Sequence, residues 1–187
     1  NPTATFSDTY TISVTVIDDD TGSNMATREV VVNNISPTID SLLVTTSIDK
    51  DGTVTLSGTY SDPGTLDTFE LDIDWNGDNV FDETIVVSGG TFMVTRQYLD
   101  NTPTATSSDT FEVNVRLRDD DMGMATASVP ITIHNVAPTD ILIHPLGMIT
   151  ENGLATLSGT ITDIGRQDTF TLDIKWGDPL SPDNVQS

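Results

Sequence analysis

The sequence predicts an all-β protein built from tandem β-sandwiches, and three observations support this fold class. Short segments recur at a constant separation of 101 residues, apolar and polar residues alternate along them, and turn-forming residues lie between them. A constant separation over many matches is typical of tandem repeats. Alternation with a period of two is typical of strands with one buried face, and no segment shows a convincing helical period.

The repeat divides the 187-residue chain into three parts. Residues 1–36 correspond to the C-terminal part of a first repeat, residues 37–136 to a complete repeat, and residues 137–187 to the N-terminal part of a third. We therefore expect a longer array, and the alternative is that the two incomplete ends join between neighbouring molecules. The matched positions include Asp8 and Asp109, Asp18 and Asp119, Asn34 and Asn135, Pro37 and Pro138, Gly58 and Gly159, Asp67 and Asp168, and Asp72 and Asp173.

The composition excludes several classes of protein. The chain carries 29 acidic and 7 basic residues, for a net charge of −22. Such a charge repels nucleic acid and anionic membrane surfaces and favours divalent cations. The absence of cysteine excludes disulfides, thiol chemistry and cysteine-ligated metals. No apolar run approaches the roughly 20 residues of a membrane span, so we expect no membrane insertion in this segment.

The complete repeat has the strand pattern of an immunoglobulin-like sandwich. Alternation places strands over residues 39–48, 53–60, 68–75, 109–118 and 125–134, with further strand material over residues 84–98. Turn residues such as Asn-Gly and Gly-Gly separate these segments. Roughly six to eight short strands in about a hundred residues is typical of that fold.

Trp75 ends the third of these strands, in register with Leu71 and Ile73. We expect its indole to fill the space between two sheets. The alternative is an exposed tryptophan that stacks on a ligand. Trp176 is its counterpart in the third repeat.

The complete repeat resembles the polycystic kidney disease (PKD) domain family. The residues that carry the resemblance are Trp75-Asn76-Gly77-Asp78, Tyr98, Asp109-Thr110-Phe111-Glu112-Val113 and Asp119-Asp120-Asp121-Met122-Gly123. The Asn-x-x-Pro linkers that begin at Asn34 and Asn135 are similar to the ends of cadherin repeats. The resemblance implies tandem PKD-like or cadherin-like immunoglobulin-fold domains of a bacterial or archaeal surface protein. It also implies an extracellular, non-catalytic role as spacer, adhesive or interaction module.

A first candidate calcium site lies between the third strand and the next. Calcium prefers six to eight hard oxygen ligands, and carboxylates at alternate residues of a tight loop converge on one point. One register of the loop begins at Asp72 and ends at Glu83. The register that fits the fold better uses Asp74, Asn76, Asp78, the Val80 carbonyl and Asp82. The alternative is an acidic hairpin with solvated side chains. In the third repeat, Lys175 occupies the position that corresponds to Asp74.

A second candidate site follows from topology. In an immunoglobulin-like sandwich the loop after the second strand and the loop between the last two strands lie at the same end. Asp62 and Asp67 would then approach Asp119, Asp120 and Asp121, where the linker residues Asn34 and Ser36 also enter. Carboxylates so placed repel one another unless a cation lies between them. By analogy with cadherins, calcium would stiffen this junction, and Asn135, Asp163 and Asp168 would be the equivalents at the next. The alternative is that these aspartates form turns in water.

The sequence predicts no enzyme, because no base accompanies the many serines and threonines. We expect a calcium-stabilised stretch of tandem repeats from a large secreted or cell-surface protein, acting as stalk, adhesin or filament building block. Its partners would be neighbouring repeats or identical subunits, or else a surface protein or polysaccharide. The alternative function is a substrate- or carbohydrate-binding accessory module of an extracellular enzyme. That role needs exposed aromatic residues, and only 6% of the chain is aromatic.

Overall fold

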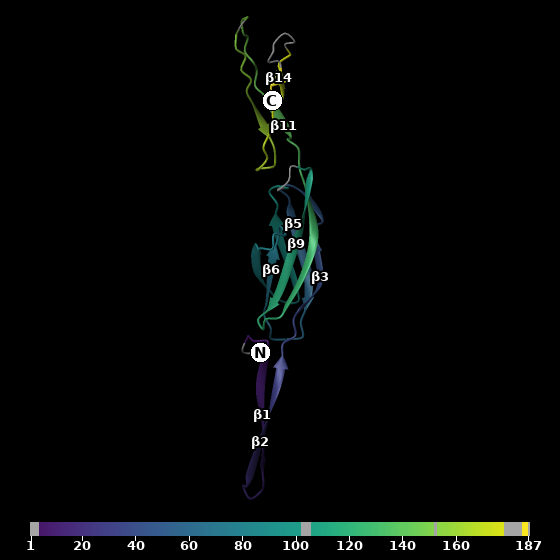
Figure 1. Cartoon of the computed structure of the whole chain (residues 1–187), viewed down its shortest axis with the longest axis vertical. Coiled ribbons are helices and arrows are strands. Elements are labelled where there is room, and N and C mark those ends of the chain that lie inside the picture. The colour runs from purple at the N-terminus through teal and green to yellow at the C-terminus, as the bar shows by residue number, and fades with distance from the viewer. Residues whose placement is uncertain (1–3, 102–105, 152, 178–184, 187) are drawn as a thin grey trace. The chain divides into compact units, whose positions relative to one another are not determined.

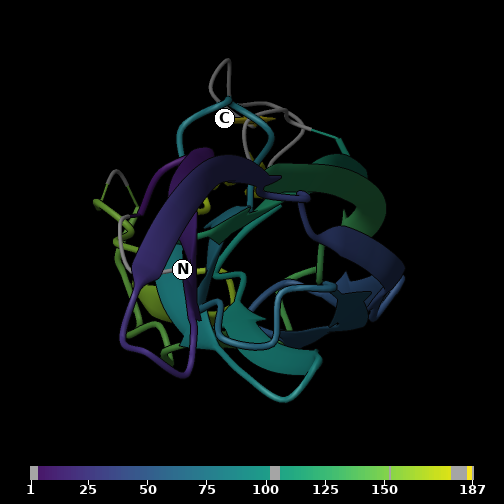
Figure 2. The same cartoon turned by 90° about the horizontal axis from the view of Figure 1, so that it is seen from below.

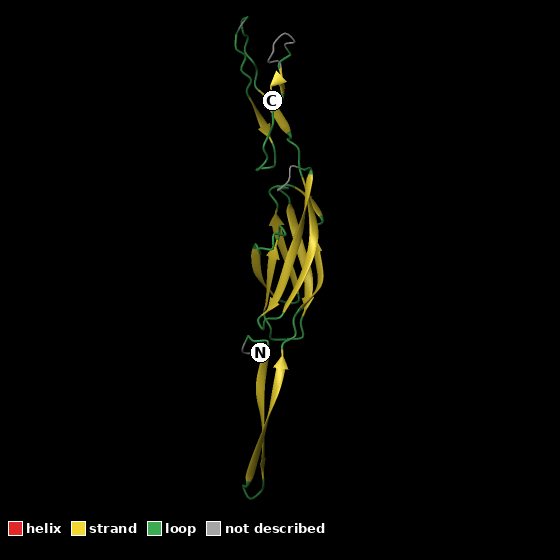
Figure 3. Cartoon of the chain, viewed as in Figure 1, coloured by secondary structure: helices red, strands yellow, loops and turns green. Residues whose placement is uncertain are grey.

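A computed structural model describes residues 4–101, 106–151, 153–177 and 185–186. In this part of the chain all the regular secondary structure consists of β-strands, which form several small sheets (Figures 1 and 3). The predicted all-β class is confirmed. Among the described residues there is no helix that is long and apolar enough to cross a membrane.

Contacts within the chain define two compact units. Unit 1 consists of Asn1–Ile48, Thr53–Arg96 and Thr110–Thr132. Unit 2 consists of Asp49–Gly52, Gln97–Asp109 and Ile133–Ser187. By sequence, Asp49–Gly52, Gln97–Asp109 and residues 133–136 of unit 2 belong to the complete repeat, and residues 137–187 belong to the third.

Two sheets form between Thr38 and His134. The larger has five strands, in the order β4 (Ser47–Asp49), β10 (Met124–His134), β9 (Ser108–Asp119), β6 (Phe69–Asp74) and β7 (Glu83–Val87). The smaller has three, in the order β3 (Thr38–Val44), β5 (Thr53–Ser61) and β8 (Thr91–Gln97). In Figure 2 these strands curl around a common centre like half of a barrel.

The predicted strands are present, and two of the predicted segments divide between the sheets. Residues 39–48 become β3 and β4, which lie in different sheets. Residues 84–98 become β7 and β8, also in different sheets. The second division occurs at Gly89 and Gly90, whose φ angles of 73° and 75° reverse the chain. Glycine adopts such angles without steric cost.

Alternate residues of these strands build the core. Trp75 is buried, which confirms its predicted place in the core. The other fully buried apolar side chains come from β5, β6, β9 and β10: Val54, Leu56, Leu71, Ile73, Val113, Val115, Leu117, Ile131 and Ile133.

The ends of the chain form shorter pairings. β1 (Ser7–Ile17) and β2 (Ser23–Asn33) make an antiparallel hairpin. β11 (Asp140–Ile143) pairs with β12 (Gly159–Thr162), and β13 (Ile174–Lys175) pairs with β14 (Val185–Gln186), both antiparallel. Trp176 is half-buried.

The hairpin β1–β2 is the counterpart of β9–β10, yet its burial differs. Ile12, Val14 and Val16 are 54%, 58% and 68% exposed. Their counterparts 101 residues later, Val113, Val115 and Leu117, are 0–1% exposed. The same alternating face is therefore a core face in the complete repeat and an uncovered face in the first.

Replacing Trp75 tests the importance of this core. Trp75→Ala is expected to lower the free energy of unfolding by about 3–5 kcal/mol, because it removes a large buried side chain and leaves a cavity. Val86→Ala, on the exposed face of the adjacent strand β7, is the control and should change it by less than about 0.5 kcal/mol. Urea denaturation followed by circular dichroism would measure both. Equal effects would contradict the role of Trp75 in the core.

Candidate metal centres

Asp72 lies inside β6, before the loop of the first candidate site begins. Its carboxylate is buried and accepts hydrogen bonds from Arg116 Nε at 2.9 Å, Arg118 Nε at 2.8 Å and Thr84 Oγ1 at 2.6 Å. Arg116 also stacks over the ring of Phe81. Burial alone would raise the pKa of Asp72, but the hydrogen bonds from the two arginines and Thr84 outweigh it and lower the pKa to about 2. Asp72 is thus committed to a buried ion-pair network.

Asp74 organises the loop through its hydrogen bonds. Oδ1 accepts the backbone N–H groups of Asn76 at 3.2 Å and Gly77 at 2.7 Å. Oδ2 accepts the N–H of Asn79 at 2.9 Å and Nδ2 of Asn114 at 3.1 Å. A carboxylate has about four lone-pair sites, so these four bonds use its acceptor capacity. Burial alone would raise the pKa of Asp74, but the same bonds outweigh it and lower the pKa.

Asp78, Asp82 and Glu83 also accept hydrogen bonds from N–H groups of Trp75 and of the loop. Asp82 Oδ2 accepts Trp75 N at 2.8 Å, and Glu83 Oε2 accepts Trp75 Nε1 at 3.2 Å. Asp78 accepts Val80 N at 2.8 Å and Asn76 Nδ2 at 3.2 Å.

Two of the loop's residues have left-handed backbone conformations. Gly77 has a φ of 76° and Asn79 a φ of 67°, and both residue types tolerate such angles. The calcium site in this loop stays a prediction. The bonds of Asp72 and Asp74 hold the strand and the loop together.

The second candidate site has the juxtaposition that topology predicted. Oxygen atoms of Asp62, Asp67 and Asp119 lie within 4.8 Å of one another. Asn34, from the linker, donates through Nδ2 to Asp119 Oδ2 at 2.8 Å. We call Asn34, Asp62, Asp67 and Asp119 the first junction cluster.

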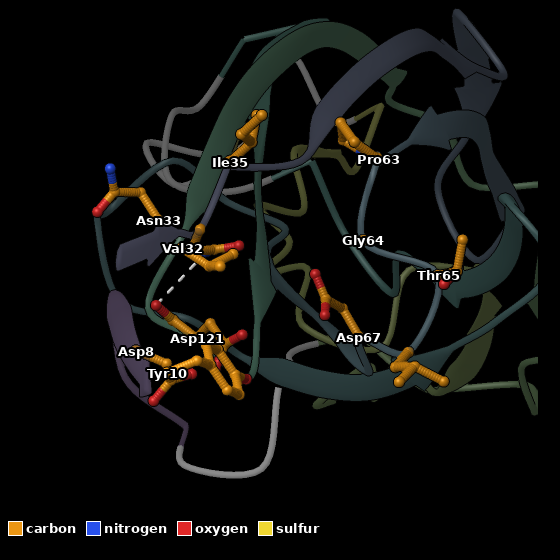
Figure 4. A pocket seen from close by; sticks show the side chains of 12 residues that line it. Asp8, Tyr10, Val32, Asn33, Ile35, Pro63, Gly64, Thr65, Asp67 and Asp121 are labelled. Atoms are coloured by element: carbon orange, nitrogen blue, oxygen red, sulfur yellow. Dashed lines mark hydrogen bonds between the residues drawn. The ribbon is translucent and has the colours of Figure 1, made fainter. Parts of the chain in front are cut away.

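The turn between β9 and β10 fixes Asp119. Its Oδ1 accepts the N–H groups of Asp121 at 3.0 Å and Gly123 at 2.6 Å. Thr68 N donates to Asp120 Oδ1 at 2.9 Å, which ties the loop before β6 to the same turn. A pocket of about 350 Å³ opens beside the cluster, and Figure 4 shows Asp67 and Asp121 in its wall.

The first junction cluster is electrostatically strained. Asp119 is buried and Asp62 is half-buried, and Asp62 Oδ2 is shielded from water with no hydrogen-bond partner. Burial, together with the charges of Asp62 and of the aspartates at 119–121, raises the pKa of Asp67. Among the residues that the structure describes, no basic side chain forms an ion pair with Asp62, Asp67 or Asp119. Whether a cation binds there stays a prediction.

The equivalent residues of the next repeat also come together, around a lysine. Asn135, Asp163 and Asp168 surround the ammonium group of Lys50. We call these three residues the second junction cluster. The sequence pattern located its acidic members but missed Lys50. The available signal was that Lys50 is one of only two lysines in a strongly acidic chain.

Comparisons with known proteins leave the family open. Neither the protein-family models nor the curated proteins include a match to this sequence. The resemblance to PKD and cadherin domains therefore rests on the residues quoted above.

Acid denaturation tests the network around Asp72. A carboxylate whose pKa is lower in the folded state stabilises the fold above its unfolded pKa, and that stabilisation is lost as pH falls through the folded pKa. For Asp72 the loss falls between about pH 4 and pH 2 and amounts to about 2 kcal/mol. Urea denaturation across this range should therefore show a shallower pH dependence for Asp72→Asn than for wild type. Asp40→Asn, at an exposed position of β3, is the control, and an unchanged profile for Asp72→Asn would contradict the assignment.

Asparagine at position 74 tests whether Asp74 anchors the loop. Asp74→Asn replaces an acceptor by an NH₂ group that faces donors, so we expect a loss of about 1–3 kcal/mol in the free energy of unfolding. The exposed Asp78→Asn should cost less than about 0.5 kcal/mol. Both are measured with a chelator present, so that calcium contributes nothing. A larger effect at Asp78 than at Asp74 would refute the anchoring role.

Proposed function

We propose that this chain is a non-catalytic stretch of tandem immunoglobulin-like sandwiches from a secreted or cell-surface protein, in which calcium stabilises the junction between repeats. Such a stretch serves as a stalk, an adhesin or a building block of a filament. The first junction cluster carries the proposal. It gathers three carboxylates from one repeat and an amide from the linker of the preceding repeat.

The chemistry of this cluster favours a hard divalent cation. Calcium binds carboxylate and amide oxygens at about 2.3–2.6 Å, in a flexible geometry that tolerates ligands from several loops. A buried carboxylate oxygen without a partner costs free energy, and Asp62 Oδ2 is in that position. A divalent ion would satisfy Asp62 and offset the repulsion that raises the pKa of Asp67.

The two sheets of the complete repeat support the sandwich. Strands of both sheets bury alternate side chains, among them Leu56 of β5 and Leu71 of β6. Two packed sheets whose inner faces alternate with outer polar residues are the arrangement of an immunoglobulin-like domain.

The turns within the hairpins β1–β2 and β9–β10 have the same geometry, which supports the tandem repeat. In the hairpin β1–β2, Asp18 Oδ1 accepts the N–H groups of Asp20 at 3.1 Å and Gly22 at 2.6 Å. These are the bonds that Asp119 makes 101 residues later. Thr21 and Met122, also 101 residues apart, both have φ angles above 70°. The repeat therefore extends from residue types to hydrogen bonds and backbone conformation.

Calcium titration tests the function and locates the site. At a calcium concentration of about 100 times Kd, binding to the folded state adds about 2.7 kcal/mol and raises the melting temperature by several degrees. A chelator should reverse the rise. Asp67→Asn should abolish most of it, because the cluster then loses a carboxylate ligand.

Asp78→Asn is the matched control, since it removes one carboxylate from the other candidate loop. It should leave the calcium response unchanged. The junction proposal fails if calcium has no effect on wild type. It also fails if the effect survives Asp67→Asn and disappears in Asp78→Asn, because calcium would then bind the loop after β6.

A further inference from the structure

We propose that the Lys50 ammonium is a tethered cation that fills the second junction cluster and locks it without metal, so that removing the ammonium turns this cluster into a calcium site. The residues concerned belong to unit 2. The lock therefore does not depend on calcium binding at the first junction cluster.

The three donors of the Lys50 ammonium match three oxygen atoms. Nζ donates to Asn135 Oδ1 at 2.8 Å, lies 3.2 Å from Asp163 Oδ1 and also donates to Asp168 Oδ2. Lys50 is 1% exposed, and a lysine is almost never buried to this extent unless it is paired. Burial alone would lower the pKa of Lys50, but the bonds to Asp168 and Asp163 outweigh it and raise the pKa. The group therefore remains a cation.

The turn that carries Lys50 is held in place. Lys50 N donates to His134 O at 2.9 Å, and Asp51 N donates to Tyr98 O at 2.7 Å. Gln97 Nε2 donates to Asp51 O and Oδ1 at 3.1 and 3.0 Å. Asp51 has a φ of 65°, a conformation in which aspartate is enriched. Because these bonds hold the turn independently of the ammonium, less conformational freedom is lost when the ammonium contacts form.

The aspartates that contact Lys50 are also held in place. Asp163 Oδ1 accepts Gly165 N at 2.5 Å, and the Asp163 side chain is only 4% exposed. A Cβ atom at Gly165 would collide with Lys50 Nζ and with the Asp168 carboxylate. Asp163 Oδ2 is buried without a hydrogen-bond partner. This oxygen is available to a further ligand if the ammonium is removed.

The two junction clusters are the same structure in successive repeats. Asn135, Asp163 and Asp168 lie 101 residues after Asn34, Asp62 and Asp67. In both clusters the first aspartate accepts the N–H of the glycine two residues later, and its Oδ2 has no partner. Equivalent side chains therefore come together at both clusters, and the second holds them around the Lys50 ammonium.

A tethered ammonium changes what controls the junction. A metal-filled junction loosens when free calcium falls, whereas a lysine cannot diffuse away. The lysine contacts are also buried, so salt screens them much less than it screens exposed charge pairs. The second junction should therefore keep its structure in a chelator, under conditions in which the first loosens.

Lys50→Met tests the lock, because methionine keeps most of the side-chain length and removes the charge. Hydrogen exchange of the Gly165 amide, which bonds to Asp163, reports on the cluster. In a chelator we expect Gly165 to exchange at least about tenfold faster in Lys50→Met than in wild type, since loss of the ammonium leaves the carboxylates of Asp163 and Asp168 uncompensated. Calcium should then slow the exchange again, and calorimetry should find one more calcium site than in wild type.

Lys175→Met is the matched control, because it removes the only other lysine from an exposed position. It should behave like wild type in both measurements. The proposal is overturned if Lys50→Met resembles Lys175→Met in Gly165 exchange, or if Lys50→Met gains no calcium site. If wild type binds no calcium but Lys50→Met binds one ion, the calcium function of the first cluster fails and the lysine lock stands.

A second comparison separates loss of the lock from loss of the fold. The amides of Leu71 and Val115 report on the core of the complete repeat and should stay protected in Lys50→Met. Asp168→Asn removes the partner carboxylate, and its effect should not add to that of Lys50→Met. Gly165 exchange in the double variant should stay within about twofold of the faster single variant. Additive effects would overturn the direct pairing of Lys50 with Asp168.

Discussion

A carboxylate that is buried away from water needs hydrogen-bond donors or a cation beside it, and the structure of this chain depends on that requirement. The chain has a net charge of −22, yet its folds bury or half-bury several aspartates. Basic residues are scarce, so they cannot neutralise each carboxylate. In the described residues Lys50, Arg116 and Arg118 pair with aspartates, and backbone N–H groups donate to Asp119, which has no basic partner.

Three solutions to this requirement occur in the described residues. Asp72 is matched by two arginines, Asp74 by backbone and side-chain amides, and Asp163 by a lysine. The Oδ2 atoms of Asp62 and Asp163 both lack a hydrogen-bond partner, but among the described residues only Asp163 has a basic side chain beside it. The first junction cluster has no basic side chain beside it among the described residues, and a metal ion is proposed there for this reason.

The sequence was sufficient for the strands and for the first junction cluster, since both depend on periodic signals. Alternation located the strands, and the shared end of two loops brought Asp67 toward Asp119. It was not sufficient for Asp72, because alternation does not distinguish a strand residue in water from one that is buried against arginines. Lys50 was also missed, since it meets Asp163 across more than a hundred residues with no pattern linking them. Such a contact depends on tertiary structure alone.

The lysine also bears on how an array of repeats could vary its junctions. The asparagine and the two aspartates are present at both junctions, so a repeat does not need new acidic residues to change its cation. In the proposed lock a single side chain, Lys50, fills the second cluster from the turn after β4, which the backbone carbonyls of His134 and Tyr98 hold in place. Replacing one lysine would then exchange a permanent lock for a calcium-dependent one.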